Sequence, residues 1–333
     1  MPTLNRRSLL RTGLVAATAL GAAPLLGACG AGGSPEAAKV QDSEEGTASA
    51  VLRPVAERFG LAQGLDLEYI AGTGPGDVQN KLLSGALDVS SFGPIGAAVS
   101  ASAGAEVLLF SPGLNNHVRW LVADGSPYRT PADLRGKAVA TPPNNSDAYR
   151  STQLASAVNG IDFEAEYDVH QGAVLNGLAL FERGDVEALI TIEPNATRLV
   201  ARGARQIATV DDLWREGSGS SEPLVLNAQG ALRSWVDANA GTAAALDRLR
   251  REVHGRIHDD PGLLAEFHEY YGIGADETEA IALLPERLVD VYPLEWGDTA
   301  FDSFQAQLDR AVELGIIDAL PEQEVFTDLG AGR

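Results

Sequence analysis

Short apolar runs alternate with amphipathic helical patterns along most of this chain. Each run is short and mostly apolar, which is the pattern of strands buried on both faces of a sheet. We expect such strands at residues 67–70, 107–110, 120–123, 137–140, 189–192 and 224–226. Because helical patterns separate them, the chain predicts parallel α/β layers.

One βαβ unit is especially clear. Val174, Leu175, Leu178 and Phe181 recur at helical spacing, and Gly184 marks the end of that helix before the strand at 189–192. From about Ala228 the pattern becomes helical. Two apolar stripes follow, Leu246, Leu249, Val253 and Ile257 on one, and Phe301, Phe304, Leu308, Val312 and Ile316 on the other. We therefore expect a helical cover at the C-terminal end.

A different pattern occupies the first 36 residues. Residues 5–11 (NRRSLLR) place two arginines before a leucine pair, and an uncharged stretch rich in Ala, Leu and Gly runs from 12 to 28. This resembles a twin-arginine export signal, and Leu26-Gly27-Ala28-Cys29 resembles a bacterial lipobox. We predict a lipoprotein signal peptide at 1–28, lipidation of Cys29 and a flexible tether at 29–36. The alternative is a membrane helix with a chance cysteine, which Gly21 and Pro24 would make a poor span.

The charge balance excludes one class of partner. The chain carries 46 Asp and Glu against 25 Lys and Arg, a formal charge of −21, so nucleic-acid phosphates would be repelled. Its single cysteine cannot form an intramolecular disulfide or a thiolate metal cluster.

Three separated segments carry a resemblance to a known family. Residues 77–88 (DVQNKLLSGALD) predict a helix that ends at a glycine, followed by a strand and the glycine-rich start of another helix. Residues 128–140 (YRTPADLRGKAVA) and 180–194 (LFERGDVEALITIEP) follow in the same order as in that family. Together they resemble the nitrate, taurine and aliphatic-sulfonate group of ABC-transporter solute-binding proteins. The resemblance covers about 65–210 and departs at the start, where only 39–41 precede DSEEG.

The resemblance implies a periplasmic-binding-protein type II fold, with two α/β lobes, a ligand cleft and a helical C-terminal cover. Lobe 1 would comprise residues 37–118 and 222–333, and lobe 2 residues 119–221. A related eukaryotic group makes the thiamine pyrimidine with a cysteine-rich motif and iron. This chain offers only Cys29, so we expect neither an enzyme nor a cofactor.

Candidate ligand contacts lie in turns that follow strands and precede helices, where helix N-termini direct free N–H groups into the crevice. These turns supply Thr73, Gly74, Phe92, Gly93, Asn144, Asn145, Ser146, Gln171 and Gly172. Asn116 and His117 enter the predicted lobe crossover, and the Glu193 carboxylate would accept hydrogen bonds from an amine or pyrimidine. Each also fits a helix cap, a turn or a hinge residue. Arg119 and Arg150 could pair an anionic head group or be surface charge.

Two further motifs have simpler interpretations. His254 and His258 lie four apart on a predicted helix, which fits a metal pair but favours a solvated helix end. Residues 217–221 (GSGSS) lack the context of a nucleophile elbow and indicate the return crossover.

We therefore expect a monomeric lipoprotein on the outer face of the cytoplasmic membrane that hands a small solute to an ABC permease and its ATPase. The favoured solute is small and polar or anionic, such as a sulfonate, taurine or nitrate. One alternative is a pyrimidine or flavin-like vitamin precursor, and a large aromatic ligand of this kind would be held by Phe92, Trp120 and Tyr149. Another is a sensor that signals closure without transport. The presence or absence of permease and ATPase genes beside its own gene would distinguish a transport receptor from a sensor.

Overall fold

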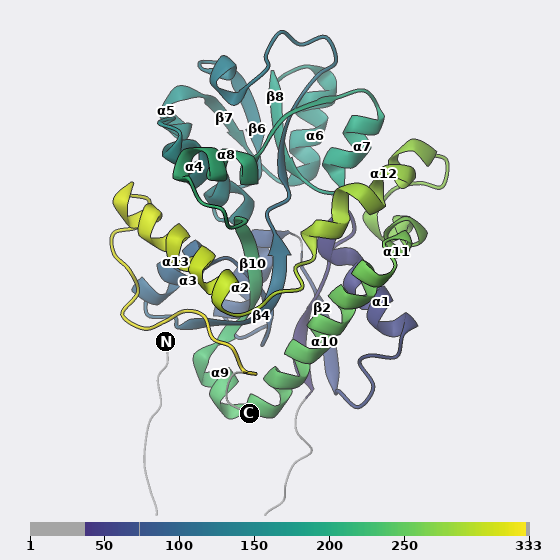
Figure 1. The fold of residues 1–333 in the computed structure, drawn as a ribbon, viewed down its shortest axis with the longest axis vertical. Coiled ribbons are helices and arrows are strands. Elements are labelled where there is room, and N and C mark those ends of the chain that lie inside the picture. The colour runs from purple at the N-terminus through teal and green to yellow at the C-terminus, as the bar shows by residue number, and fades with distance from the viewer. Residues whose placement is uncertain (1–36, 73, 331–333) are drawn as a thin grey trace, which may run out of the picture. The chain divides into compact units, whose positions relative to one another are not determined.

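Strands of the described chain form a two-stranded, a three-stranded and a five-stranded sheet. A single bridge joins the two smaller sheets, which together are called the first sheet, and the five-stranded sheet is the second. The computed structural model describes residues 37–72 and 74–330 (Figure 1). The predicted signal peptide, Cys29, the predicted tether and Thr73 lie outside this part. The strands are β1 (Ala38–Asp42), β2 (Leu67–Ala71), β3 (Ser90–Phe92), β4 (Val107–Asn115), β5 (Val118–Val122), β6 (Ala138–Thr141), β7 (Asp168–Gln171), β8 (Ala188–Ile192), β9 (Arg205–Thr209) and β10 (Val225–Leu232).

Each sheet gathers strands from one part of the fold. In the first, β1 pairs with β2, β10 lies between β3 and β4, and Val40 bridges to Val89 so that β1 also borders β3. In the second, the order is β7-β6-β8-β5-β9. We call the elements around the first sheet lobe 1 and those around the second lobe 2. The chain passes between them from β4 to β5 and returns to β10.

The expectation of parallel layers is only partly correct. β6 pairs in parallel with β7 and β8, and β1 with β2, whereas β5 and β10 are antiparallel to their neighbours. These two strands lie next to the crossovers, so their direction follows from the passage between lobes. β10 also continues to Leu232, so the helical region begins later than Ala228. Strand β2, expected to be buried on both faces, is half-exposed because it lies at a sheet edge.

Helices flank both sheets. They are α1 (Leu52–Arg58), α2 (Pro75–Leu83), α3 (Pro94–Ser102), α4 (Asp147–Val158), α5 (Phe163–Glu166), α6 (Val174–Arg183), α7 (Asn195–Ala201), α8 (Val210–Ser218), α9 (Arg233–Ala238), α10 (Ala240–Asp259), α11 (Gly262–Glu266), α12 (Thr278–Leu288) and α13 (Asp298–Glu313). Single 3-10 turns are η1 (Ala48–Val51), η2 (Pro131–Leu134), η3 (His268–Tyr271) and η4 (Val289–Val291).

Local sequence explains several helix ends. Ser146 caps α4, because its Oγ accepts a hydrogen bond from Tyr149 N at 3.2 Å. Helix α6 ends at Gly184, whose φ of 74° is the left-handed conformation that glycine adopts without strain. The predicted βαβ unit is therefore confirmed as β7, α6 and β8.

The C-terminal cover is present as α10 to α13, but one histidine differs from expectation. His254 is fully buried in α10, and its Nδ1 lies 2.8 Å from Pro293 O. His258 Nε2 lies 2.7 Å from Tyr292 O. Interpreting the pair as a solvated helix end was wrong, because the segment after α12 packs over this face of α10. Within the described ranges, no group of three or more His, Cys, Asp or Glu side chains is placed to hold a metal ion.

Aromatic rings fill much of the main core. Trp120 packs edge-on against Phe163 at 6.0 Å, and α13 brings Phe304 into the same cluster. No helix in the described ranges has both the length and the apolar character needed to cross a membrane.

Candidate solute-binding cleft

The carboxyl ends of strands from both lobes meet around a small cleft. Helices α2 and α4 begin there, directly after the turns that follow β2 and β6, so their free N–H groups and partial positive charge face the same region. The cleft encloses about 60 Å³. Its lining comprises Gln41, Asp42, Glu44, Thr47, Ala48, Ser49, Gly72, Gly74, Val78, Ser91, Leu114, His117, Asp147, Ala148, Ile192, Leu226 and Asn227.

The loop after β1 forms one wall of this cleft. It holds Glu44 and Thr47 and follows Asp42, the last residue of β1, in the segment where the family resemblance was weakest. Gln41 anchors the loop, because its Oε1 accepts a hydrogen bond from Ser91 N at 2.8 Å. Arg53 holds Asp42 from outside the cleft at 2.9 Å.

Asp147 is the buried charge of the cleft. It is the first residue of α4 and only 7% exposed. Its Oδ2 accepts a hydrogen bond from Gln79 Nε2 at 3.0 Å, whereas its buried Oδ1 accepts none and lies 3.7 Å from Arg150 Nη1. Burial raises the pKa of Asp147 to about 6, and this rise is only partly offset by Arg150, by the hydrogen bond from Gln79 and by the N–H of Gly93, which lies near the carboxylate without a well-aligned hydrogen bond to Oδ1. At neutral pH the ionised carboxylate therefore lacks part of the stabilisation that water would supply.

His117 adds a second acceptor. Its Nδ1 lies 2.9 Å from Asn115 O, and because a carbonyl only accepts, Nδ1 must carry the proton. Burial and the nearby Arg119 lower the pKa of His117 to about 4 despite that hydrogen bond. The ring is thus neutral at pH 7, with Nε2 left as an acceptor.

The lining is acidic. Asp42, Glu44 and Asp147 contribute carboxylates, while none of the described lining residues is Lys or Arg. Burial and the charge of Asp77 raise the pKa of Glu44. The arrangement therefore favours a solute that donates hydrogen bonds or carries positive charge.

Contacts between the lobes hold the cleft nearly closed. Gln79 of α2 donates to Asp147 of α4 and accepts from Arg150 Nη1 at 3.3 Å. Asn145 lies against Gly76, where an added Cβ would be 2.4 Å from its Nδ2. Asn195 Nδ2 donates to Gly46 O at 2.9 Å. A solute larger than a few water molecules can enter only if these contacts open.

The structure distributes the predicted contacts among several places. Gly74 and His117 line the cleft, and Gly93 borders it through Asp147. Ser146 is buried as a helix cap, and Asn145 touches the opposite lobe. In lobe 2, Gln171 Oε1 accepts from Asn144 N, and Gly172 N donates to Thr141 O.

The described lining of the cleft includes no Phe, Tyr or Trp. Phe92, Trp120 and Tyr149 are each at most 2% exposed and belong to the core. The cleft therefore offers none of these rings for stacking on a large ligand.

Glu193 and Asn116 line a second, larger cavity of about 770 Å³. Glu193 is fully buried after the strand β8, where Arg287 Nη2 donates to its Oε1 at 2.7 Å and Arg119 Nε lies 3.4 Å away. Thr197 N and Oγ1 donate to its other oxygen. The carboxylate and both arginines thus satisfy one another. The predicted anion contacts Arg119 and Arg150 are both engaged with carboxylates of this chain.

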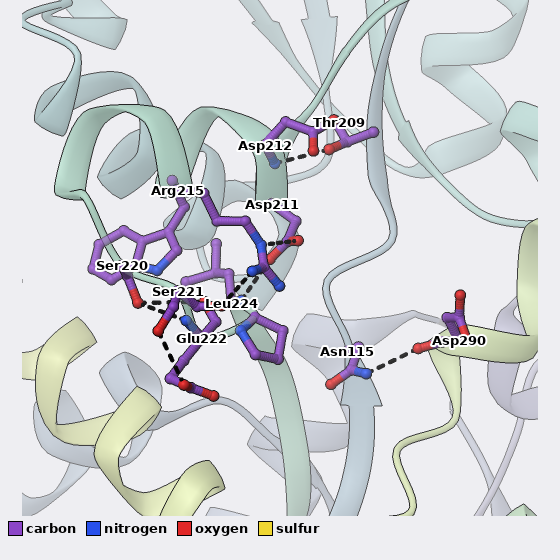
Figure 2. A network of polar contacts seen from close by, with 12 residues as sticks. Asn115, Thr209, Asp211, Asp212, Arg215, Ser220, Ser221, Glu222, Leu224 and Asp290 are labelled. Carbon is purple, nitrogen blue, oxygen red and sulfur yellow. Dashed lines mark hydrogen bonds and ion pairs between the residues drawn. The ribbon is translucent and has the colours of Figure 1, made fainter.

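A polar network fixes the wall of this larger cavity (Figure 2). Arg215 pairs with Asp211 at 2.9 Å and donates to Ser221 O, which anchors the return crossover to α8. Asp211 also accepts from Leu224 N, and Asn115 Nδ2 donates to Asp290 O at 2.8 Å. These partners tie the crossovers to α8 and to the segment after α12. In the smaller cleft, by contrast, Asp147 Oδ1 is a buried acceptor without a hydrogen bond, at the start of a helix.

Sequence reasoning missed Asp147, Glu44, Thr47 and Asn227. Asp147 had one local signal, an acidic residue directly after the predicted cap Ser146. Asn227 had none, because its role depends on β4, where its Oδ1 accepts from Leu114 N at 3.1 Å.

Two lobes with a cleft at their strand ends are an architecture typical of solute-binding proteins. The comparisons specify the family. The model described as "ABC transporter, phosphonate, periplasmic substrate-binding protein" matches residues 41–238, more than half of the chain. The chain belongs to this family of periplasmic substrate-binding components of ABC transporters. No curated protein sequence matches it.

Solved structures share the fold at low sequence identity. The aliphatic sulphonate binding protein SsuA from Escherichia coli has a TM-score of 0.64 and 18% identity, over 87% of this chain and 96% of that one. The alkanesulfonate-binding protein SsuA from Xanthomonas axonopodis, bound to MOPS, has a TM-score of 0.69 and 19% identity, over 88% and 99%. The desulfurization enzyme DSZB has a TM-score of 0.58 and 13% identity, over 86% and 94%. These likenesses show the fold alone.

Proposed function

We propose that this protein captures a small, amine-bearing polar solute by lobe closure and delivers it to an ABC permease with its ATPase. Taurine, which combines an amine with a sulfonate, and aminopyrimidines are the solute classes that fit. The proposal rests on the environment of Asp147, a buried carboxylate in the cleft wall whose Oδ1 accepts no hydrogen bond.

The charge of the cleft supports an amine. An ammonium or amino group beside Asp147 would donate to the free Oδ1 and offset the burial of its charge. Glu44 and the Nε2 of His117 would accept further hydrogen bonds. A solute whose only charged group is anionic, such as nitrate or an alkanesulfonate, would be repelled by these acceptors. Its anionic end would have to lie at the N-termini of α2 and α4.

Matched pairs of compounds test this proposal. Isothermal titration of the full-length protein compares taurine with 2-hydroxyethanesulfonate, and 2-methyl-4-aminopyrimidine with 2-methylpyrimidine. We expect the amine-bearing member of at least one pair to bind ten times more tightly or better. Asp147→Asn should remove most of that difference, because the amide cannot supply a negative acceptor.

Asp124→Asn is the matched control, since Asp124 is exposed in the turn after β5 of the same lobe. This control variant should leave the affinities for both members of each pair of compounds unchanged. Equal or tighter binding of the amine-free members, unaffected by Asp147→Asn, would contradict the amine proposal while leaving the receptor function intact. Absence of binding for every compound would contradict both solute classes.

The membrane anchor is a second part of the proposal. The lipobox-like segment before Cys29 supports export and lipidation, which would keep the receptor beside its permease. Cys29→Ser should release the protein from the membrane fraction and abolish incorporation of radiolabelled palmitate. Retention of the variant on membranes would contradict lipid anchoring at this residue.

A further inference from the structure

Helix α4 meets lobe 1 through a short run of polar side chains. Asn145, Asp147 and Arg150 belong to lobe 2, where they precede the helix or lie in its first turns. Asp147 and Arg150 are three positions apart, so they share one face of α4. The proposed contact between Asp147 and the solute accounts for only one of these three side chains.

Glycines of lobe 1 give the first two side chains room. Asn145 lies against Gly76 of α2, and Asp147 lies against Gly93, the residue before α3. An added Cβ would be 2.4 Å from Asn145 Nδ2 in the first case and 2.5 Å from Asp147 Oδ1 in the second. Both polar ends therefore lie directly on the backbone of the opposite lobe.

Arg150 repeats this arrangement one turn further along α4. An added Cβ on Gly96 of α3 would lie 2.7 Å from Arg150 Nη1 and 3.1 Å from Phe92 Cε1. Gly96 is buried, and the Arg150 side chain is only 19% exposed. The guanidinium of a lobe 2 residue is thus enclosed by lobe 1, at a position that a larger residue in place of Gly96 would obstruct.

Gln79 of α2 completes the contact. It is only 5% exposed, and its Nε2 donates to Asp147 Oδ2 at 3.0 Å while its Oε1 accepts from Arg150 Nη1 at 3.3 Å. One amide therefore serves an anion and a cation of the opposite lobe, and it can do so only while the lobes are together. Because water can replace each of these polar contacts, the arrangement can form and separate repeatedly.

We propose that Arg150 is a latch residue, which holds the two lobes together once they have closed. Placed between Gly96 and Gln79, it stabilises the closed form and slows the departure of a captured solute. It acts without touching the solute, since neither Arg150 nor Gln79 is among the described residues that line the cleft. The effect on solute release rests on the proposed function, whereas closure can be measured in the protein alone.

The separation of the lobes is measured without any solute. Nitroxide labels at Glu68→Cys of lobe 1 and Glu187→Cys of lobe 2, both exposed positions, report it by double electron–electron resonance in the full-length protein carrying Cys29→Ser. We expect a closed population, and Arg150→Gln and Gly96→Ala should each lower the ratio of closed to open form roughly tenfold. Gly96→Ala keeps every charge and introduces a better helix former, so it tests displacement of the guanidinium by itself.

Two substitutions in α10 are the matched controls. Arg248→Gln removes an exposed charge, and Gly255→Ala adds a Cβ that meets no neighbouring group within 4 Å. Both should leave the closed population unchanged. An open separation in the protein with Arg150 and Gly96 intact, or a closed population that survives both Arg150→Gln and Gly96→Ala, would overturn the latch.

Solute kinetics test the consequence for the proposed function. Taurine or 2-methyl-4-aminopyrimidine should dissociate roughly tenfold faster from Arg150→Gln and Gly96→Ala in stopped-flow experiments, with a nearly unchanged association rate. Tighter binding of the amine by Arg150→Gln, with no change in Gly96→Ala, would mean that Arg150 acts only through its charge and would contradict the latch. Failure of both compounds to bind would contradict the solute classes alone, because the separation of the lobes decides on the latch independently.

Discussion

Replacing Asp147 with Asn should stabilise this protein at neutral pH. Burial raises the pKa of the carboxyl from 3.8 to about 6, so the folded state binds the proton more tightly than the unfolded chain does. The stabilisation that protonation provides is fully present below the unfolded pKa and is lost as pH rises through about 6. The rise in pKa corresponds to about 3 kcal/mol of folding free energy. Asn imitates the protonated form and removes this dependence.

Denaturant unfolding of the full-length proteins at pH 4, 5, 6 and 7.5 measures the effect. We expect the free energy of unfolding of Asp147→Asn to exceed that of the unmodified protein by up to about 3 kcal/mol at pH 7.5, and the two to converge at pH 4. Other groups titrate equally in both proteins, so the difference isolates Asp147. Asp124→Asn should change the free energy by less than about 0.5 kcal/mol at every pH.

A variant that is less stable at pH 7.5, or a difference that does not vary with pH, would refute this reasoning. Either result would mean that Gln79, Arg150 and the N-terminus of α4 fully compensate the buried carboxylate. The expected result, combined with weaker solute binding, would show that the cleft keeps an unfavourable charge for recognition.

Three other substitutions test the roles assigned to neighbouring groups. Glu193→Gln leaves Arg119 and Arg287 without their buried counter-charge and should cost roughly 3 kcal/mol in denaturant unfolding. Calorimetric solute affinity should stay unchanged, and its loss would place Glu193 in the site. Gly93→Ala puts a Cβ 2.5 Å from Asp147 Oδ1, so we expect a tenfold weaker solute affinity. Gly241→Ala, with no atom within 4 Å, should bind normally, and equal binding by both variants would contradict the contact. Arg198 and the other partners lower the pKa of Glu277 to about 2, so its contribution is present above pH 4.5 and is lost as pH falls toward 2. Glu277→Gln should therefore destabilise by roughly 1 kcal/mol at pH 7 and by less at pH 3, and an equal effect at both would argue against the ion pair.

Local patterns predicted the elements that depend on local chemistry. The cap at Ser146, the end of α6 at Gly184 and the strand β8 follow from capping, glycine and hydrophobic periodicity. Strand direction could not be predicted from local sequence, because the antiparallel pairing of β5 and β10 depends on where the chain passes between the lobes.

The charges of the site depend on contacts between distant segments. Gln79 and Asp147 are 68 positions apart, and Glu193 meets Arg287 across 94 positions. A carboxylate after a strand has the same local sequence signal whether it binds a solute or an arginine of its own chain. Sequence therefore indicated the turns around the cleft but did not separate Asp147 from Glu193.

The most direct test of the account is a crystal structure of the full-length protein grown with the tightest-binding member of the taurine and aminopyrimidine pairs. The account predicts that the compound lies in the cleft between the loop after β1 and the start of α4, with its amine nitrogen within hydrogen-bond distance of Asp147. A compound bound instead in the larger cavity beside Arg119, or one that turns its anionic end toward Asp147, would contradict it.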